Sequence, residues 1–224
     1  DPELSRGLGD VYKRQIFIQK NSNEFERVAC PALKADQIHE DVDAVWFDFE
    51  NDGDQDLYVV SGGASQPSEH EDYQDRLYLN DGSGQLVRSS KGILPEFKFS
   101  GSRVAAKDFD NDGDLDLFIG SRFVPGKYPT SPESILLINE NGKFSKVQCA
   151  ASSSGMVTDV KWADINGDQR VDLVLATEWG PVRVYENKEV GFKEITKNIG
   201  LNEFTGWWNC CLLYTSPSPR DNSG

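Results

Sequence analysis

The sequence predicts an all-β fold, a partial β-propeller of four-stranded antiparallel blades with acidic loops between the first and second strands. Three observations predict it. An acidic nine-residue stretch occurs three times at intervals of about 60 residues, short runs of β-forming residues flank each copy, and turn residues separate the remaining runs. Propellers repeat four-stranded sheets around an axis, whereas the repeats of a linear β-solenoid, the alternative architecture, are shorter.

The second acidic stretch, 108–116, is the most regular. Acids occupy its first, third, fifth, seventh and ninth positions, and Gly113 occupies the sixth. Carboxylates this close repel one another unless a cation lies among them, and Ca²⁺ takes roughly 6–8 oxygen ligands. Glycine permits the positive φ of a chain that wraps an ion. The stretch therefore predicts a calcium site with side-chain ligands Asp108, Asp110, Asp112 and Asp116, and with the backbone carbonyl of Asp114.

The other two stretches depart from this pattern. The first predicts the ligands Asp48, Glu50, Asp52, Asp54 and Asp56, and the third predicts Asp164, Asn166, Asp168 and Asp172. The first loop must fit the longer side chain of Glu50, and the third has fewer acids and Gln169 at the sixth position. We therefore expect calcium affinity to fall from the second loop to the first and then to the third. Ordinary acidic surface turns are the alternative interpretation. An EF-hand is excluded, since its twelfth position needs a glutamate and here is apolar.

Taken in order, the chain predicts a half blade at 16–30, a connector at 31–40 and three complete blades. The blades span about 41–90, 101–149 and 156–197, and a further blade is expected to begin at 206–210. In each, two strands flank the acidic loop and two more form a hairpin around turn residues such as Asn80-Asp81-Gly82. One apolar residue follows each hairpin turn, and we expect all four to be core residues that pack between repeats: Phe25, Leu86, Phe144 and Phe192.

The two ends of the chain encode one DNA element read on opposite strands. With one codon choice for 5–15, the reverse complement shifted by one base encodes 211–220. The element resembles a transposon adapter used to prepare sequencing libraries. We therefore expect 1–15 and 211–224 to be adapter-derived, and 16–210 to be a fragment of one propeller domain.

Composition narrows the classes of partner. The net charge of −14 argues against nucleic acid, because phosphate binding needs basic patches. No apolar run approaches the roughly 18 residues of a membrane span. Cys30 and Cys149 lie in different repeats, and we expect both to be small unpaired thiols. Residues 121–132 carry Arg122, Lys127 and Tyr128, either as a ligand-recognition segment or as a proline-stiffened connector packed on its neighbour.

The acidic loops and the strands that leave them resemble the FG-GAP/VCBS repeat family, the propeller also found at the head of integrin α chains. The matching residues include Asp56-Leu57-Tyr58-Val59, Asp116-Leu117-Phe118-Ile119 and Asp172-Leu173-Val174-Leu175. Val124–Pro129 and 206–209 are similar to secreted bacterial members, some with an ASPIC/UnbV region. The resemblance implies structural Ca²⁺ in the loop between the first and second strands of each blade, and an extracellular, secreted module.

We therefore expect a non-enzymatic, calcium-stabilised binding or adhesion module with a protein or carbohydrate ligand. The alternative is a scaffold for a secreted enzyme that acts on polysaccharide, with catalytic residues outside this sequence. Against the alternative, the two histidines, His39 and His70, stand alone in polar connectors, and the hydrolase and metalloprotease motifs are absent.

Overall fold

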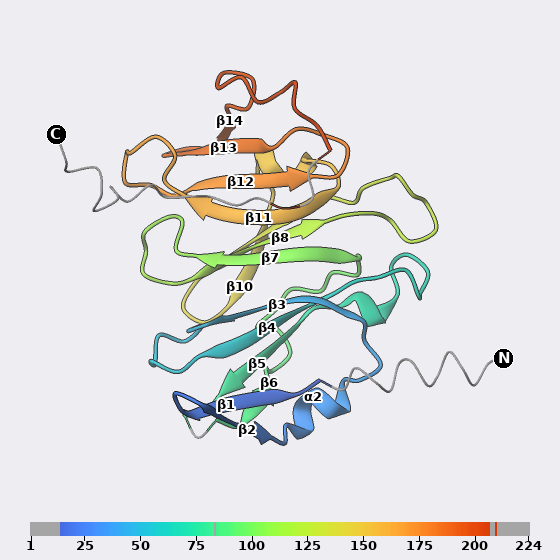
Figure 1. Ribbon diagram of the computed structural model, residues 1–224, viewed down its shortest axis with the longest axis vertical. Helices are drawn as coiled ribbons and strands as arrows, with labels where there is room; N and C mark the ends of the chain where they lie inside the picture. Colours follow the sequence, from blue (N-terminus) through green and yellow to red (C-terminus); the bar gives the residue numbers. More distant parts are fainter. Residues whose placement is uncertain (1–13, 83, 207–208, 210–224) are drawn as a thin grey trace.

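A computed structural model shows an all-β chain and describes residues 14–82, 84–206 and 209. Four antiparallel sheets are stacked along the long axis of the molecule (Figure 1). The predicted fold class is confirmed: the chain folds as part of a β-propeller with four-stranded antiparallel blades. No helix among the described residues is long and apolar enough to cross a membrane.

The sheets follow the chain in order, because each strand pairs with the next one in sequence. The two-stranded sheet holds β1 (Ile16–Asn21) and β2 (Glu24–Val28). The first blade holds β3 (Asp41–Phe47), β4 (Asp56–Ser61), β5 (Arg76–Asn80) and β6 (Leu86–Arg88). The second holds β7 (Gly101–Lys107), β8 (Asp116–Ser121), β9 (Ile135–Asn139) and β10 (Phe144–Val147). The third holds β11 (Val157–Ala163), β12 (Asp172–Thr177), β13 (Arg183–Lys188) and β14 (Gly191–Glu194).

Burial along the strands follows from their place in the sheet. The second strand of each blade, β4, β8 or β12, is buried at all six positions, in keeping with its near-continuous apolar sequence. The fourth strand is an edge strand with one buried residue, and its other residues are exposed or half-buried. The first strands β3, β7 and β11 are neighbours across the blades: Val104 N donates to Asp43 Oδ2, and Trp162 Nε1 donates to Ala105 O.

The core lies between the blades. One cluster joins Phe47 and Phe49 of the first repeat to Leu117 and Phe144 of the second. A second cluster joins Phe109 of the second repeat to Phe192 of the third, which stacks near it at 5.5 Å between ring centroids. Each blade is therefore held mainly by its neighbour, as in other repeat architectures.

Three of the four core residues predicted after the hairpin turns are confirmed. Leu86, Phe144 and Phe192 are buried. The prediction for Phe25 is wrong: its side chain is 62% exposed. Phe25 pairs with Gln19 and shares a face of the two-stranded sheet with Phe17, which is also exposed. No sheet in the described part of the chain packs against that face, so the aromatic ring has nothing to contact.

The predicted connector 31–40 contains a short helix, α2 (Pro31–Ala35). Proline is favoured at the first helical turn, because its missing N–H would be unpaired there in any case. The helix places Leu33 against Tyr78 and Leu86 of the first blade. Two further turns of 3₁₀ helix are η1 (Glu71–Tyr73) and η2 (Ala150–Ser153). The blade expected to begin at 206–210 lies largely outside the described residues, as do the expected terminal adapter segments apart from Arg14 and Gln15.

Candidate metal centre

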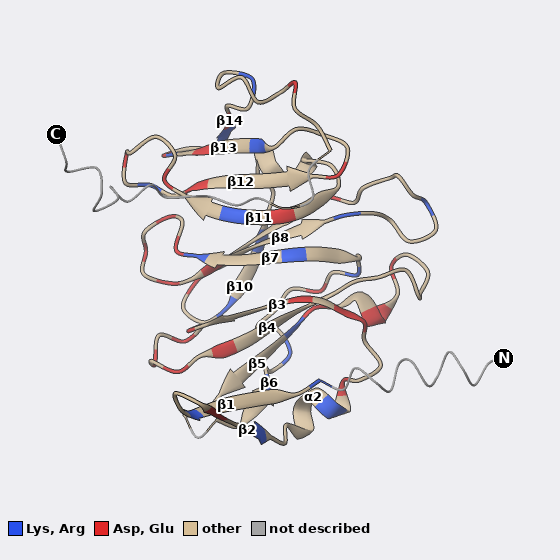
Figure 2. Ribbon diagram, in the orientation of Figure 1, with Lys and Arg blue, Asp and Glu red and all other residues tan. Residues whose placement is uncertain are grey.

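The three acidic stretches form equivalent loops on one rim of the molecule. Each joins the first strand of a blade to the second: β3 to β4, β7 to β8 and β11 to β12. Figure 2 shows their acidic residues gathered at the strand ends on the left of the view. This is the position predicted from the sequence for the calcium-binding loops.

The side chain of the first-position aspartate closes each loop by a hydrogen bond to its sixth position. Its Oδ2 accepts a hydrogen bond from the backbone N–H at position six in all three loops. The distances are 2.9 Å from Gly53 to Asp48, 3.2 Å from Gly113 to Asp108 and 3.0 Å from Gln169 to Asp164. The fifth-position aspartates Asp52, Asp112 and Asp168 likewise accept from the N–H at position seven, at 3.0, 2.9 and 3.0 Å. The loops thus hold their carboxylates in place through their own backbones.

The ninth-position aspartate is buried in every loop and anchors the loop to the sheet. Asp116 is 0% exposed; its Oδ2 accepts from Phe109 N at 3.3 Å and its Oδ1 from Asn139 N at 2.9 Å. Asp56 and Asp172 make the same pair of contacts, to Phe49 and Asn80 and to Ile165 and Asn187. Burial, together with the nearby carboxylates of Asp110 and Asp112, raises the pKa of Asp116 to about 7. Burial also raises the pKa of Asp56.

The second loop brings three of its predicted ligands together. Oxygen atoms of Asp108, Asp110 and Asp116 all lie within 4.8 Å of one another. Burial and the neighbouring carboxylates raise the pKa of Asp110, so the ionised cluster is electrostatically unfavourable by itself. A hard divalent cation fits this set, because it prefers carboxylate and carbonyl oxygens and would neutralise their repulsion.

In the first loop, burial and the charges of its neighbours likewise raise the pKa of Glu50. In the third loop, polar and charged groups of the protein already contact two of the predicted ligands, Asn166 and Asp168. Asn166 Nδ2 donates to Asp168 at 3.2 Å and to Glu186 at 2.9 Å, and the Arg170 guanidinium lies 3.6 Å from Asp168. The backbone N–H of Arg170 lowers the pKa of Asp168. The predicted ligand sets of these two loops remain predictions.

In the second loop, the seventh-position side chain, Asp114, links this loop to the first loop and to the β9–β10 turn. Asp114 Oδ1 accepts from Asn51 Nδ2 of the first loop at 2.7 Å, and its Oδ2 accepts from Asn141 N at 3.0 Å. This leaves the backbone carbonyl of Asp114 as its predicted ligand atom.

The sequence analysis missed a second strained position in each loop. The fourth residue has a positive φ as well as the sixth: Asn51 at 55°, Asn111 at 62° and Gly167 at 78°. The third loop has therefore exchanged the two residue types, with glycine at position four and Gln169, at φ 69°, at position six. The Asn-x-Gly and Gly-x-Gln patterns were the available signal, because asparagine tolerates this conformation better than most non-glycine residues.

Sequence reasoning also missed an asparagine that joins the first loop, and another that joins the second loop, to the next blade. Asn139 Nδ2 donates to Phe49 O at 3.1 Å, and Asn187 Nδ2 donates to Phe109 O at 2.7 Å. Both asparagines lie at the end of the third strand of the following blade, Asn139 as its last residue and Asn187 as its second to last, and both are buried. Their similar place before each hairpin turn was the available signal in the sequence.

Replacing Gln169 with glycine is expected to strengthen calcium binding at the third loop. A non-glycine residue at this φ costs about 1 kcal/mol, which corresponds to roughly fivefold in affinity if the strain grows as the loop closes on the ion. Titration calorimetry of Gln169→Gly checks this, with the reverse change Gly113→Gln, expected to weaken the second loop, as its matched control. Unchanged or weaker binding by Gln169→Gly would contradict the role assigned to position six.

Comparison with known proteins agrees with this architecture. The family model of the FG-GAP-like repeat matches residues 48–119, from the first acidic loop to the strand after the second. Phosphatidylinositol-glycan-specific phospholipase D of Bos taurus is 29% identical over 152 residues, which is 60% of this chain and 18% of that protein. The Homo sapiens protein of the same name is 28% identical over 153 residues, with the same coverage. The chain thus spans about a fifth of the length of these relatives. The family predicted from the acidic loops is confirmed for the matched segment: residues 48–119 of this chain carry FG-GAP-like repeat sequence.

Proposed function

We propose that this chain is a non-enzymatic binding module of the extracellular space whose blades are stabilised by calcium. The observation that carries the proposal is the second acidic loop, where three carboxylates converge within 4.8 Å. Calcium outside cells is millimolar, a range that suits sites of modest affinity.

Asp108, Asp110, Asp112 and Asp116, with the Asp114 carbonyl, would hold the ion of the second loop. A bound ion would supply positive charge among carboxylates that otherwise repel one another. Asp116 accepts hydrogen bonds from Phe109 and Asn139 and so joins the loop to the sheet. The side chain of Asn139 also donates to the carbonyl of Phe49, which joins the neighbouring blades. Stabilising the loop therefore stabilises the contact between blades.

The second candidate is a repeat scaffold within a longer enzyme. It is favoured by the relatives, which are named as phospholipases D and extend far beyond the matched segment. In either case, the two histidines have structural roles within this chain. His39 Nδ1 lies 2.8 Å from Asp72 O, and His70 Nδ1 accepts from Asp72 N at 3.2 Å, so both rings have structural partners in the loop before β5.

Removal of calcium is expected to lower the melting temperature of the chain by roughly 10–20 °C. A ligand at 100 times its dissociation constant adds about 2.7 kcal/mol per site, and we expect two well-formed sites. Thermal melts in calcium and in chelator measure this. Magnesium at equal ionic strength is the control and should restore less, because it demands a stricter octahedral geometry. Equal melting temperatures in calcium and chelator would contradict the proposal.

A further inference from the structure

The junction of the second and third blades carries a structured surface on the rim opposite the acidic loops. It is formed where β8 and β12 end, by the segments 122–132 and 178–182. The equivalent segment of the first blade, 62–75, contains the 3₁₀ helix η1 and follows a different path.

One carboxylate organises this surface. Glu178 Oε2 accepts from Arg122 Nε at 2.8 Å and its Oε1 accepts from Tyr128 OH at 3.0 Å. Trp179 Nε1 in turn donates to Tyr128 OH at 2.9 Å. The Arg122 hydrogen bond, and then that of Tyr128, lower the pKa of Glu178. Arg122 and Tyr128, two of the residues singled out in the sequence, thus contact the neighbouring blade, as the connector interpretation expected.

The same contacts fix two aromatic rings in solvent. Tyr128 is 53% exposed and Trp179 is 67% exposed, although their polar atoms are already hydrogen-bonded within the protein. The rings meet edge to face at 6.4 Å, and Phe123 meets Tyr128 at 6.5 Å in the same manner. Three backbone hydrogen bonds within 124–130 support the segment. We call Tyr128 and Trp179 the aromatic platform; what it still offers a partner is its apolar ring surface.

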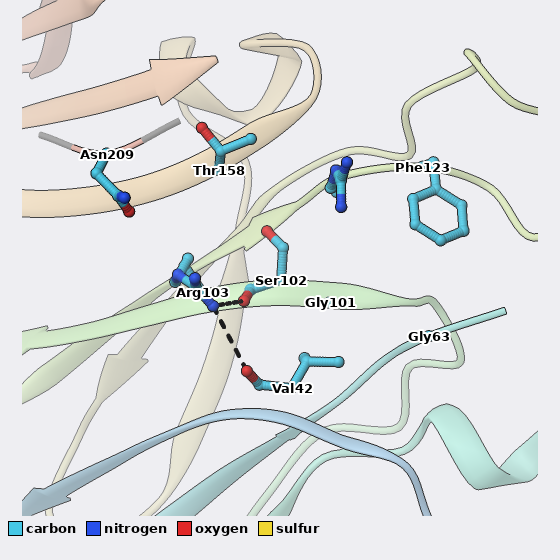
Figure 3. Close-up of a pocket in the computed structure, with 9 residues that line it drawn as sticks. Val42, Gly63, Gly101, Ser102, Arg103, Phe123, Thr158 and Asn209 are labelled. Carbon is cyan, nitrogen blue, oxygen red and sulfur yellow. Dashed lines mark hydrogen bonds between the residues drawn. The ribbon is translucent and has the colours of Figure 1, made fainter. Parts of the chain in front are cut away.

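A cavity of about 390 Å³ opens beside the platform. Phe123, which contacts the platform, is also part of the cavity wall together with Arg103, Arg122 and Thr158 (Figure 3). Its volume is at the small end of the range for ligand pockets, so it suits one small chemical unit rather than a protein domain.

Arg103 is part of the cavity wall, and its guanidinium forms no ion pair with a described residue. Its Nη1 donates to Ser102 O at 3.1 Å and to Val42 O at 3.5 Å, which orients the half-buried guanidinium (Figure 3). Its Nε and Nη2 have no partner among the described residues. The β7 register shifts between Gly101 and Arg103, a bulge that re-aims side chains. No acidic residue is part of the described cavity wall, although the chain carries a net charge of −14.

We propose that this junction binds an acidic saccharide, with the carboxylate of a uronic acid unit on Arg103 and a sugar ring on the aromatic platform. Planar guanidinium groups pair with carboxylates through two parallel hydrogen bonds. A uronic acid unit carries a carboxylate and an apolar ring face together, which matches a cation and exposed aromatic rings at one junction. An acidic peptide would need two separate side chains to make the same contacts. The site names a ligand class for the proposed binding module and rests on that proposal.

Titration of the full chain with trigalacturonic acid tests the site, by calorimetry and by quenching of tryptophan fluorescence at fixed saturating calcium. We expect binding, and only weak binding of the neutral galactotriose. Arg103→Gln should lower the affinity for trigalacturonic acid about tenfold and Trp179→Ala roughly fivefold. Lys143→Gln, which removes an exposed positive charge from the β9–β10 turn, is the matched control and should change affinity less than about twofold.

Three results would overturn the proposal. The first is no binding of trigalacturonic acid, and the second is binding of galactotriose with the same affinity. The third is an affinity for trigalacturonic acid in Arg103→Gln and Trp179→Ala equal to that of the unmodified chain. Binding of a hexaglutamate peptide in place of the saccharide, sensitive to both substitutions, would overturn it in favour of a peptide site. Melts of the same samples in calcium and chelator separate the two proposals. A calcium effect without saccharide binding refutes the ligand class alone, and saccharide binding without a calcium effect refutes the calcium role alone.

Discussion

Replacing Asp116 with alanine is expected to lower the free energy of unfolding by roughly 2–5 kcal/mol, even without calcium. The reason is local: the fully buried carboxylate is the acceptor for two backbone N–H groups, those of Phe109 and Asn139. Alanine leaves both without this partner, and each unsatisfied buried donor costs about 1–3 kcal/mol. Denaturant unfolding in chelator measures the loss apart from any effect on metal binding.

Asp114→Ala is the matched control, because it removes a carboxylate from the same loop two residues away. The side chain of Asp114 makes exposed hydrogen bonds to Asn51 and Asn141, so its loss should cost less than about 1 kcal/mol. If both variants were equally stable in chelator, the anchoring role of the ninth position would be wrong.

Phe144→Ala is expected to cost about 3–5 kcal/mol, the usual range for a large aromatic side chain in a core. Phe144 is 2% exposed and packs 5.1 Å from Phe49 and 6.4 Å from Phe47, both in the preceding repeat. The truncation therefore opens a cavity at the contact between the first and second blades. It should lower stability without removing any acidic side chain.

Phe25→Ala is the control, since Phe25 follows a hairpin turn at the same place in its repeat. With its side chain 62% exposed, its truncation should change the free energy of unfolding by less than about 0.5 kcal/mol. Urea denaturation of both variants decides: similar losses would show that the core does not lie between the blades as described.

The architecture was accessible from the sequence because it rests on local patterns. Alternating and apolar runs predicted the strands, and the acidic stretches fixed their order by marking the same turn in each blade. The predicted blade 41–90 contains β3 to β6, and the predicted blade 101–149 contains β7 to β10. Each pattern depends only on the residues of one segment. Because the same pattern occurs in three successive blades, each copy supported the interpretation of the others.

Predictions that depended on neighbouring segments were less secure. Phe25 has the sequence context of Phe144, yet burial depends on a second sheet that the repeat pattern does not specify. The contacts of Arg122 and Tyr128 with Glu178 join residues about 50 positions apart, and no local pattern predicts that pairing. Strain at the fourth loop position was hidden because asparagine occurs in turns for several reasons.

Direct calcium titration of the full chain and of Asp108→Asn, Asp48→Asn and Asp164→Asn tests the central claim most directly. Each substitution neutralises the first-position ligand of one loop while keeping an amide oxygen that can accept a backbone hydrogen bond. The account predicts saturable binding, loss of the tightest site in Asp108→Asn, loss of the next in Asp48→Asn, and the smallest change in Asp164→Asn. Absence of calcium binding by the unmodified chain, or identical isotherms for all four proteins, would contradict it.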